Sequence, residues 1–297
     1  MQTIQVRSER PQEHVALITL SRPSVHNVQG MQMTYELNAA FDGAAHDDDV
    51  KVIVLAADGT NFSAGHDLAG DNGKTWRDYP IVGTWADFDA GGAEGRYSRE
   101  KEIYLELAER WRNIPKPTIA AVQGKCISGG LILAWVCDLI IASEDAQFRD
   151  STPDLGLPGG EFFMHPYELG VRKAKEWLFT TGWIGAREAE RRGMVNQVVP
   201  RGELTSAALS LAGIIAQRSA FTLKAIKEVC NLAQDASGRR QTNQFAFGLH
   251  HLAHVHNQLK FGLHADPNGM PENVRAKFYQ RMGMDPATPP GSSSKDE

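Results

Sequence analysis

The chain has 297 residues, 42% of them hydrophobic and 23% charged, with a formal net charge of −5 and a pI near 6.1. This composition is typical of a soluble globular protein with one large domain or two small ones. A mildly acidic chain has no general electrostatic attraction to nucleic acid or to anionic membranes. We therefore expect neither nucleic acid nor membrane as a partner.

The cysteines and the N-terminus indicate where the protein works. Cys126, Cys137 and Cys230 have no CxxC spacing, which argues against a disulfide framework or a zinc site and fits a reducing compartment. The first residues, MQTIQVRSERPQEH, lack the apolar core of a signal peptide. The longest apolar run, 131–137, is much shorter than the ~20 residues that span a membrane. We expect a cytoplasmic protein.

The first predicted elements form a β-α-β unit. Segments 14–21 and 50–57 are continuous runs of β-branched and aliphatic residues, typical of strands buried on both faces. Between them, Met33, Leu37 and Phe41 recur at helical spacing. The segments therefore predict two strands joined by an amphipathic helix.

The same arrangement recurs further along the chain. The apolar run 118–123 is followed by a helical segment at 129–137 and another apolar run at 138–143. Residues 69–100 are rich in Gly, Asp and aromatic residues, and we expect a long surface insertion there. One α/β domain is predicted, with no repeat of fixed period.

After residue 160 the patterns are mainly helical, with one short strand predicted at 195–199. The end of the chain, PATPPGSSSKDE, has the composition of a disordered tail. We divide the chain into a core domain over 1–200, a helical region over 201–284 and a disordered tail over 285–297.

Two glycine-containing turns follow predicted strands. Gly129 and Gly130 precede an apolar helical segment, where a glycine amide is an unpaired donor that a ligand oxygen can approach closely. Taken alone, such a pair also suits a tight turn or close helix packing. Gly65 lies in a second turn, NFSAGHDL at 61–68, after the strand at 50–57. Because α/β proteins bind ligands at such strand ends, we predict a binding site between the two turns.

Several motifs occur together in a fixed order. They are SRPSVHN at 21–27, FSAGHDL at 62–68, AAVQG at 120–124, SGG at 128–130, CD at 137–138, AQF at 146–148 and GMVNQVVP at 193–200. Between about residues 14 and 230 the chain resembles the crotonase (enoyl-CoA hydratase/isomerase) superfamily. The resemblance implies an α/β fold, a crotonase-like spiral of repeated ββα units with a helical C-terminal trimerisation region. It also implies a homotrimer or a dimer of trimers.

The resemblance further implies an acyl-CoA thioester substrate whose carbonyl oxygen lies between the amides of His66 and Gly129. Negative charge develops on that oxygen during reaction, and one such donor is typically worth ~2.7–4 kcal/mol. The ring of His66 is expected to be a wall of the pocket. No separate cofactor is implied, because coenzyme A is part of the substrate. Its binding is expected to involve five residues, which are Arg22, Val25, Ala64, Asp67 and Leu68. Arg22 is expected either to approach a phosphate or to remain solvated.

The chain departs from the family pattern at the acids. Hydratases of this family carry two glutamates, at positions that correspond to Ile132 and Thr152, and neither side chain can transfer a proton at neutral pH. Other members place an acid further along, in a window that here contains Glu161. We interpret Glu161 as the proton-transfer residue, with its pKa raised by the adjacent Phe162 and Phe163.

Other interpretations of this region stay open. Glu161 also fits a solvent-facing acid in the first turn of a helix. Asp150, Asp154 and His165 are alternative proton-transfer candidates.

Histidines gather near the C-terminus, in LHHLAHVHNQ at 249–258. His250, His251 and His254 have helical i, i+3 and i+4 relations, which invites a metal interpretation. No HExxH motif and no carboxylate partner accompany them, and the related enzymes need no metal. We therefore predict no metal site, and expect these histidines on a helix surface or a subunit interface.

The predicted function is acyl-CoA processing through a thioester enolate, by default hydration or isomerisation of a 2-enoyl-CoA. Aromatic residues within 69–100 suggest a large acyl group. One alternative is carbon–carbon hydrolysis of a cyclic β-diketone or its CoA ester, suggested by AQFRDSTP at 146–153, although Pro153 stands where those hydrolases have a histidine. The other is a non-catalytic acyl-CoA-binding protein.

Overall fold

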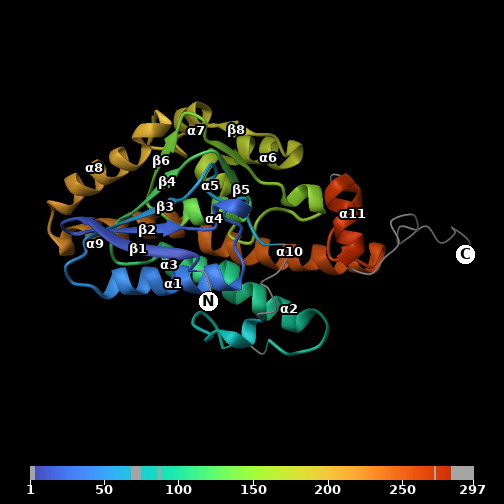
Figure 1. Cartoon of the computed structure of the whole chain (residues 1–297). Coiled ribbons are helices and arrows are strands. Elements are labelled where there is room, and N and C mark those ends of the chain that lie inside the picture. Colours follow the sequence, from blue (N-terminus) through green and yellow to red (C-terminus); the bar gives the residue numbers. More distant parts are fainter. Residues whose placement is uncertain (1–3, 68–74, 86–87, 271, 282–297) are drawn as a thin grey trace, which may run out of the picture.

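The computed structural model describes residues 4–67, 75–85, 88–270 and 272–281. A six-stranded sheet in the order β1-β2-β3-β4-β6-β9 forms its centre (Figure 1). The strands are β1 (Val6–Gln12), β2 (Val15–Leu20), β3 (Val52–Ala57), β4 (Thr118–Val122), β6 (Leu139–Ser143) and β9 (Gln197–Val199). Strand β1 pairs antiparallel with β2, and the other neighbours are parallel. The predicted strands at 14–21, 50–57, 118–123, 138–143 and 195–199 are confirmed.

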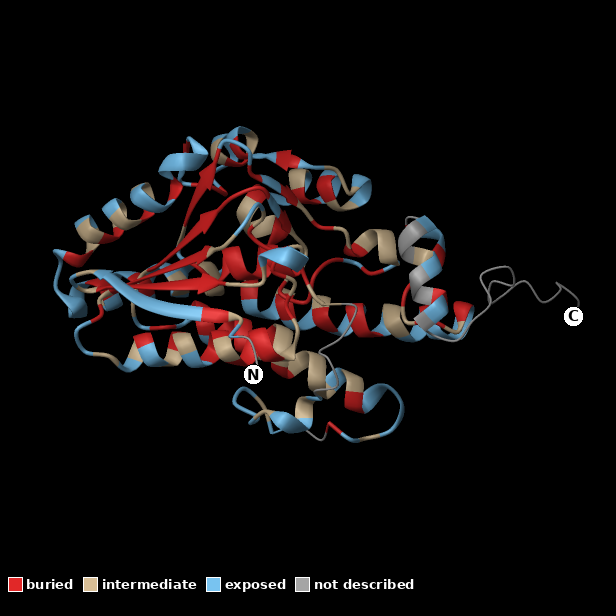
Figure 2. Ribbon diagram, viewed as in Figure 1, coloured by how far each residue is buried: buried red, intermediate tan, exposed pale blue. Residues whose placement is uncertain are grey.

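Both faces of this sheet are covered, which explains the continuous apolar runs. Alternate residues of β2, such as Val15 and Leu17, pack with helix α8 (Leu204–Ala216). Ala16 and Ile18 belong to a larger core on the opposite face. Figure 2 shows the inner strands of the sheet as mostly buried and the edge strand β1 as mostly exposed.

Several helices contribute to the larger core, among them α1 (Met31–His46), α3 (Leu107–Arg112) and α4 (Gly129–Trp135). The buried side chains of α1 include Met33, Leu37 and Phe41, so the predicted helical face is confirmed. Strand β1 was not predicted, because five of its seven residues are exposed and polar or proline at the edge of the sheet.

A small second sheet has the strand order β5-β7-β8. Its strands are β5 (Lys125–Ile127), β7 (Gln147–Arg149) and β8 (Ile184–Gly185). Strands β5 and β7 are parallel, so the segments that follow them leave the sheet at the same edge. The next helices are α5 (His165–Leu169), α6 (Val171–Thr180) and α7 (Ala186–Arg192).

The segment expected as a surface insertion is partly helical. Residues 92–112 run continuously through α2 (Gly92–Glu100), a π-helical stretch (Lys101–Glu106) and α3. Phe88 and Gly95 are buried, so the end of the predicted insertion packs onto the protein. Parts of it, residues 68–74 and 86–87, lie outside the described residues.

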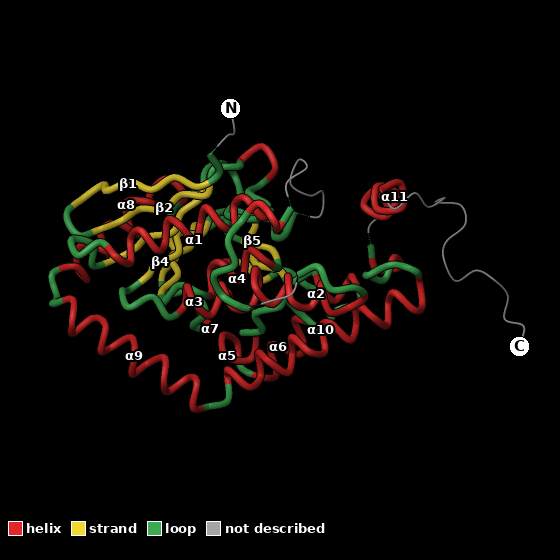
Figure 3. The backbone as a smooth tube through the Cα atoms, turned by 90° about the horizontal axis from the view of Figure 1, so that it is seen from below, coloured by secondary structure: helices red, strands yellow, loops and turns green. Residues whose placement is uncertain are grey.

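Three further helices follow α8, namely α9 (Ala220–Ala236), α10 (Arg239–Phe261) and α11 (Glu272–Arg281). Figure 3 shows α9 and α10 as two long helices outside the sheet. Short 3-10 helices span Pro23–Val25, Trp76–Asp78, Thr152–Leu155, Arg201–Glu203 and Pro267–Gly269. Among the described residues, no helix is long and apolar enough to cross a bilayer. The domain limits at 200 and 284 stay predictions, and the tail at 285–297 lies outside the described residues.

Candidate active site

The two predicted glycine turns touch. A methyl group built on Gly65, whose φ is +94°, would lie 2.9 Å from the Ile127 carbonyl oxygen and 3.3 Å from the Gly129 amide nitrogen. A methyl group on Gly129 would lie 3.2 Å from the His66 amide nitrogen. Both positions therefore need glycine, because side chains there would fill the space that the turns share.

The two amides at this contact have no main-chain acceptor within the described part of the chain. The Gln29 amide donates to the Gly65 carbonyl oxygen at 2.8 Å, and the Asp67 amide donates to the Gln29 carbonyl oxygen at 2.9 Å. These two bonds form a short parallel bridge in which the amide of His66 takes no part. Gly129 is the first residue of α4, where an amide has no intrahelical acceptor. Two N–H donors thus lie beside one small space.

A buried carboxylate holds the turn that precedes Gly129. Ser128 has the unusual φ and ψ of 45° and −102°, and its hydroxyl donates to Asp150 Oδ1 at 3.2 Å. The other oxygen of Asp150 accepts from the Gly160 amide at 3.0 Å and from His165 Nε2 at 2.9 Å. Asp150 therefore links the turn at Gly129 to the turn that carries Glu161.

Asp150 and His165, two of the alternative proton-transfer candidates, bind each other. Asp150 and His165 are 1% and 0% exposed, and they form a buried pair. Burial alone would raise the pKa of Asp150, but the hydrogen bond and charge of His165 hold this pKa well below its ordinary value. The His165 ring packs against Trp135 and Trp177. The Asp150–His165 pair therefore stabilises the turns next to Gly129 and Glu161.

Replacing Asp150 by asparagine should lower the free energy of unfolding by ~3 kcal/mol, because the change breaks a buried charge pair. Since the pKa of Asp150 is lowered in the fold, its contribution is present above the ordinary value near 4 and is lost as the pH falls. Urea unfolding at several pH values should show a shallower acid decline in the variant. Asp154→Asn is the control, and equal losses in the two variants would contradict the assignment.

Glu161 contacts the His66 ring. Its Oε2 atom accepts a hydrogen bond from His66 Nε2 at 3.1 Å, and its Oε1 atom lies 3.6 Å from His250 Nε2. In the same ring, Cε1 and Nδ1 lie 2.7 and 2.8 Å from a methyl group built on Gly129. One imidazole therefore contacts the carboxylate and also lies close to Gly129. Glu161 is only 5% exposed and precedes α5, so the interpretation as a solvent-facing acid in a helix is wrong.

The expected direction of the Glu161 pKa is also wrong. Burial raises this pKa, as predicted, but the charges of His66 and His250 and the His66 hydrogen bond outweigh it and lower the pKa to about 2. Glu161 is therefore a carboxylate at neutral pH, and can accept a proton. The His66 ring is more than a pocket wall, because it holds this carboxylate.

The helical segment 92–112 closes the site on another side. The Tyr104 ring stacks on the His66 ring with centroids 3.8 Å apart. Nearby Glu100 is largely buried, and its burial together with the charge of Glu161 raises its pKa to about 7. Sequence spacing gave no signal for either residue.

A hollow of about 530 Å³ adjoins this region, and its lining includes Gln29, Asp67, Trp76 and Tyr104. Of the aromatic residues in the predicted insertion, Trp76 thus lines an open space. Trp85 is fully exposed instead. The role of this segment as a cover for the acyl group stays a prediction.

The residues expected at coenzyme A lie along two adjacent segments. Arg22 donates to Asp67 Oδ2 and to the Val28 carbonyl oxygen, both at 2.9 Å, so it is not simply solvated. Val25 is 40% exposed, and the Ala64 amide donates to the His26 carbonyl oxygen. Leu68 lies outside the described residues. Coenzyme A binding by these residues stays a prediction.

Comparisons with known proteins decide the family. A family model described as enoyl-CoA hydratase/isomerase matches residues 10–268. The chain belongs to this family. A relative named "Putative enoyl-CoA hydratase EchA13", from Mycobacterium tuberculosis, is 42% identical over 271 residues, which cover 84% of each chain. The "4-chlorobenzoyl coenzyme A dehalogenase-2" of an Arthrobacter species is 31% identical over 65% of each chain.

A solved structure gives the same result. The crystal structure of a probable enoyl-CoA hydratase from Mycobacterium thermoresistibile has a TM-score of 0.81 and 42% identity, and covers 89% of this chain and 100% of its own. The predicted crotonase fold with C-terminal helices is confirmed. The protein is an enzyme of the crotonase family that acts on acyl-CoA.

In this crotonase the two positions of the usual hydratase glutamates are occupied otherwise. Ile132 is 4% exposed and belongs to the main core. Thr152 is 6% exposed, and its hydroxyl donates to Asp150 at 2.7 Å. Asp154 forms an ion pair with Arg149 at 2.7 Å. Glu161 is thus the carboxylate of the predicted set that contacts the His66 ring.

Proposed function

We propose that this crotonase moves a proton on an acyl-CoA thioester through an enolate held by the amides of His66 and Gly129. Glu161 is the residue that accepts and returns the proton. One observation carries the proposal: the His66 imidazole that bonds the buried Glu161 carboxylate also lies close to Gly129, where two amides have no main-chain acceptor among the described residues.

The proposed reaction is migration of a double bond. The Glu161 carboxylate takes a proton from the α-carbon of a 3-enoyl thioester, and the electron pair moves onto the thioester oxygen. The amides of His66 and Gly129 donate to that oxygen as its charge develops. Protonated Glu161 then returns the proton to the γ-carbon, which leaves a 2-enoyl thioester. The atoms balance without water or any cofactor.

The site has one candidate carboxylate, Glu161, where the usual hydratases have two glutamates, and this favours isomerisation over hydration. Water addition in the usual hydratases employs two glutamates, whereas Ile132 and Thr152 stand at those positions here. A single carboxylate can carry one proton between two carbons of the same substrate. The His66 hydrogen bond to Glu161 fixes the carboxylate during both transfers.

The test is exchange in D₂O with a panel of 2-enoyl, 3-enoyl and cyclic acyl-CoA esters. NMR and mass spectrometry should show deuterium at the α- or γ-carbon and a shifted double bond. A product heavier by one water identifies hydration, and a ring-opened product with one added water identifies the hydrolase. Tight binding of every ester without exchange or conversion identifies a non-catalytic binding protein. Each of these last three results would overturn the proposed isomerisation.

We also propose that the chain assembles as a trimer or a dimer of trimers. Helix α9 exposes large apolar side chains, among them Phe221 (80%), Val229 (68%) and Leu232 (67%). An apolar helix face of this kind is commonly buried against another surface. Sedimentation analysis should give a mass of three or six chains.

A further inference from the structure

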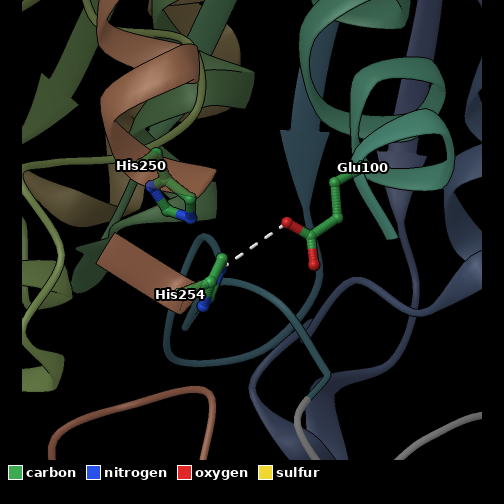
Figure 4. Close-up of side chains that lie close together, drawn as sticks. All are labelled: Glu100, His250 and His254. Carbon is green, nitrogen blue, oxygen red and sulfur yellow. Dashed lines mark ion pairs between the residues drawn. The ribbon is translucent and has the colours of Figure 1, made fainter. Parts of the chain in front are cut away.

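We propose that Glu100, His250 and His254 bind a divalent transition-metal ion, with zinc as the test ion. Figure 4 shows the carboxylate at the end of α2 facing the two imidazoles of α10. One ligand atom from each residue lies within 4.8 Å of the other two. The site adjoins Glu161, since His250 Nε2 lies 3.6 Å from Glu161 Oε1. Zinc titration and deuterium exchange are separate measurements, so either proposal can fail without the other.

The two histidines are oriented for this task. His250 Nδ1 lies 2.8 Å from the Gly159 carbonyl oxygen, and His254 Nδ1 lies 2.6 Å from the His264 carbonyl oxygen. A carbonyl oxygen only accepts, so each Nδ1 carries the proton that it donates. In the neutral ring each Nε2 therefore offers a lone pair. Metal-binding histidines are usually fixed by such a bond from the other nitrogen.

The remaining contacts fit an ion better than a shared proton. His254 Nε2 lies 3.6 Å from Glu100 Oε2, and His250 Nε2 lies 3.6 Å from Glu161 Oε1. These distances exceed those of N–H···O hydrogen bonds. Among the described residues, Glu100 Oε2 and His250 Nε2 are buried without a hydrogen-bond partner, and His250 is 1% exposed. A cation between a buried lone pair and a carboxylate stabilises both, and either a proton or a metal ion can take that place.

Two further side chains, Arg96 and His251, lie close to Glu100. Arg96 lies 3.8 Å from the other oxygen of Glu100, Oε1, and lines a hollow together with His251 and His254. His251 Nε2 lies 3.3 Å from Glu100 Oε2 and also has no hydrogen-bond partner within the described chain. It is the nearest further imidazole to the proposed site.

Two imidazoles and one carboxylate are a ligand set that zinc accepts, with ligand distances of about 2.0–2.2 Å and a fourth position open. The ligand atoms, which lie up to 4.8 Å apart, must move closer together to reach those distances. A hollow of about 300 Å³ lined by Arg96, His251, His254 and His264 adjoins His254. The expectation that no carboxylate accompanies these histidines is wrong, because Glu100 lies 150 positions from His250 in the sequence and beside it in the fold. The expectation of surface histidines is wrong for His250 and His251, which are 1% and 7% exposed.

The experiment titrates the untagged, EDTA-dialysed protein with zinc chloride in competition with a chromophoric chelator. We expect one zinc ion per chain, bound at micromolar concentration or below. Cobalt(II) should give a visible spectrum with nitrogen and oxygen ligands, which zinc abolishes. Absence of zinc binding at 100 µM, about a hundredfold above the expected dissociation constant, would overturn the proposal.

Two variants and one control locate the site. His254→Ala and Glu100→Gln should each weaken zinc binding at least ~10-fold. His256→Ala is the matched control, since His256 is exposed on the same helix, and its affinity should equal that of the wild type. Circular dichroism checks that each variant is folded. Zinc affinity that is unchanged in both site variants, or lost equally in the control, would contradict the assignment. If a variant does not fold, the cobalt spectrum of the wild type decides, because a spectrum without nitrogen ligands would also overturn it.

Discussion

Replacing Gly129 by alanine is expected to lower kcat/KM by ~10²–10³-fold, the typical effect of losing one oxyanion donor. The added methyl group would stand 3.2 Å from the His66 amide nitrogen and 2.7 Å from His66 Cε1. It would therefore occupy the space in which the thioester oxygen is proposed to lie. Steady-state kinetics on the substrate identified by the D₂O panel would measure the loss.

Gly43→Ala is the matched control, because it makes the same chemical change in a different place. Gly43 lies on the exposed side of α1, and nothing lies within 4 Å of a methyl group built there. Alanine should leave activity unchanged and strengthen the helix slightly. Thermal unfolding of both variants separates lost activity from lost structure. A Gly129→Ala enzyme with kcat/KM within threefold of the wild type would show that the oxygen is bound elsewhere.

The sheet could be predicted because its signal is local. Strands β2 and β3 are buried on both faces, so every residue is apolar or small, and the run is visible without knowledge of the neighbours. Strand β1 has five exposed residues, and its pairing depends on the edge that β2 presents. Residues 92–100 contain two glycines and several charges, and their helix is held by its position against α10.

The two amides could be expected from sequence, because the motifs FSAGHDL and SGG resemble those of the crotonase family. The pKa of Glu161 could not, since its direction depends on residues that are far away in the sequence. His66 is 95 positions from Glu161, and His250 approaches it from α10. The sequence shows that Phe162 lies next to Glu161, and burial raises the pKa of Glu161. It does not show that His66 and His250 lie close to the carboxylate, and these two imidazoles lower the pKa below its ordinary value.

The same reasoning explains the cluster around Glu100. Its histidines could be read from their helical spacing, but the carboxylate comes from α2, in a segment whose composition suggested a surface loop. Helices α2 and α10 together form the cluster of Glu100, His250 and His254, which could not be predicted from either segment alone. Glu161 thus lies between two imidazoles, with Oε2 bonded to His66 and Oε1 facing His250.

Substitution of Glu161 by glutamine should lower kcat by ~10²–10⁴-fold, the usual contribution of a general acid–base residue. Glutamine keeps the size of the side chain and can still accept from His66 Nε2, but it cannot take a proton from carbon. Substrate affinity, measured by calorimetry, should stay within a few fold, because the amides of His66 and Gly129 remain. Deuterium exchange at the α-carbon should fall in parallel with turnover.

Asp154→Asn provides the control for this change, since it neutralises the alternative acid in the same segment. Asp154 is bonded to Arg149 at 2.7 Å and has 27% of its side chain exposed, so its loss should leave exchange nearly unchanged. If exchange instead disappears in Asp154→Asn and persists in Glu161→Gln, the proton passes through the loop at 150–155. If both variants exchange at the rate of the wild type, neither carboxylate carries the proton, and the enolate must be formed by a group other than these two.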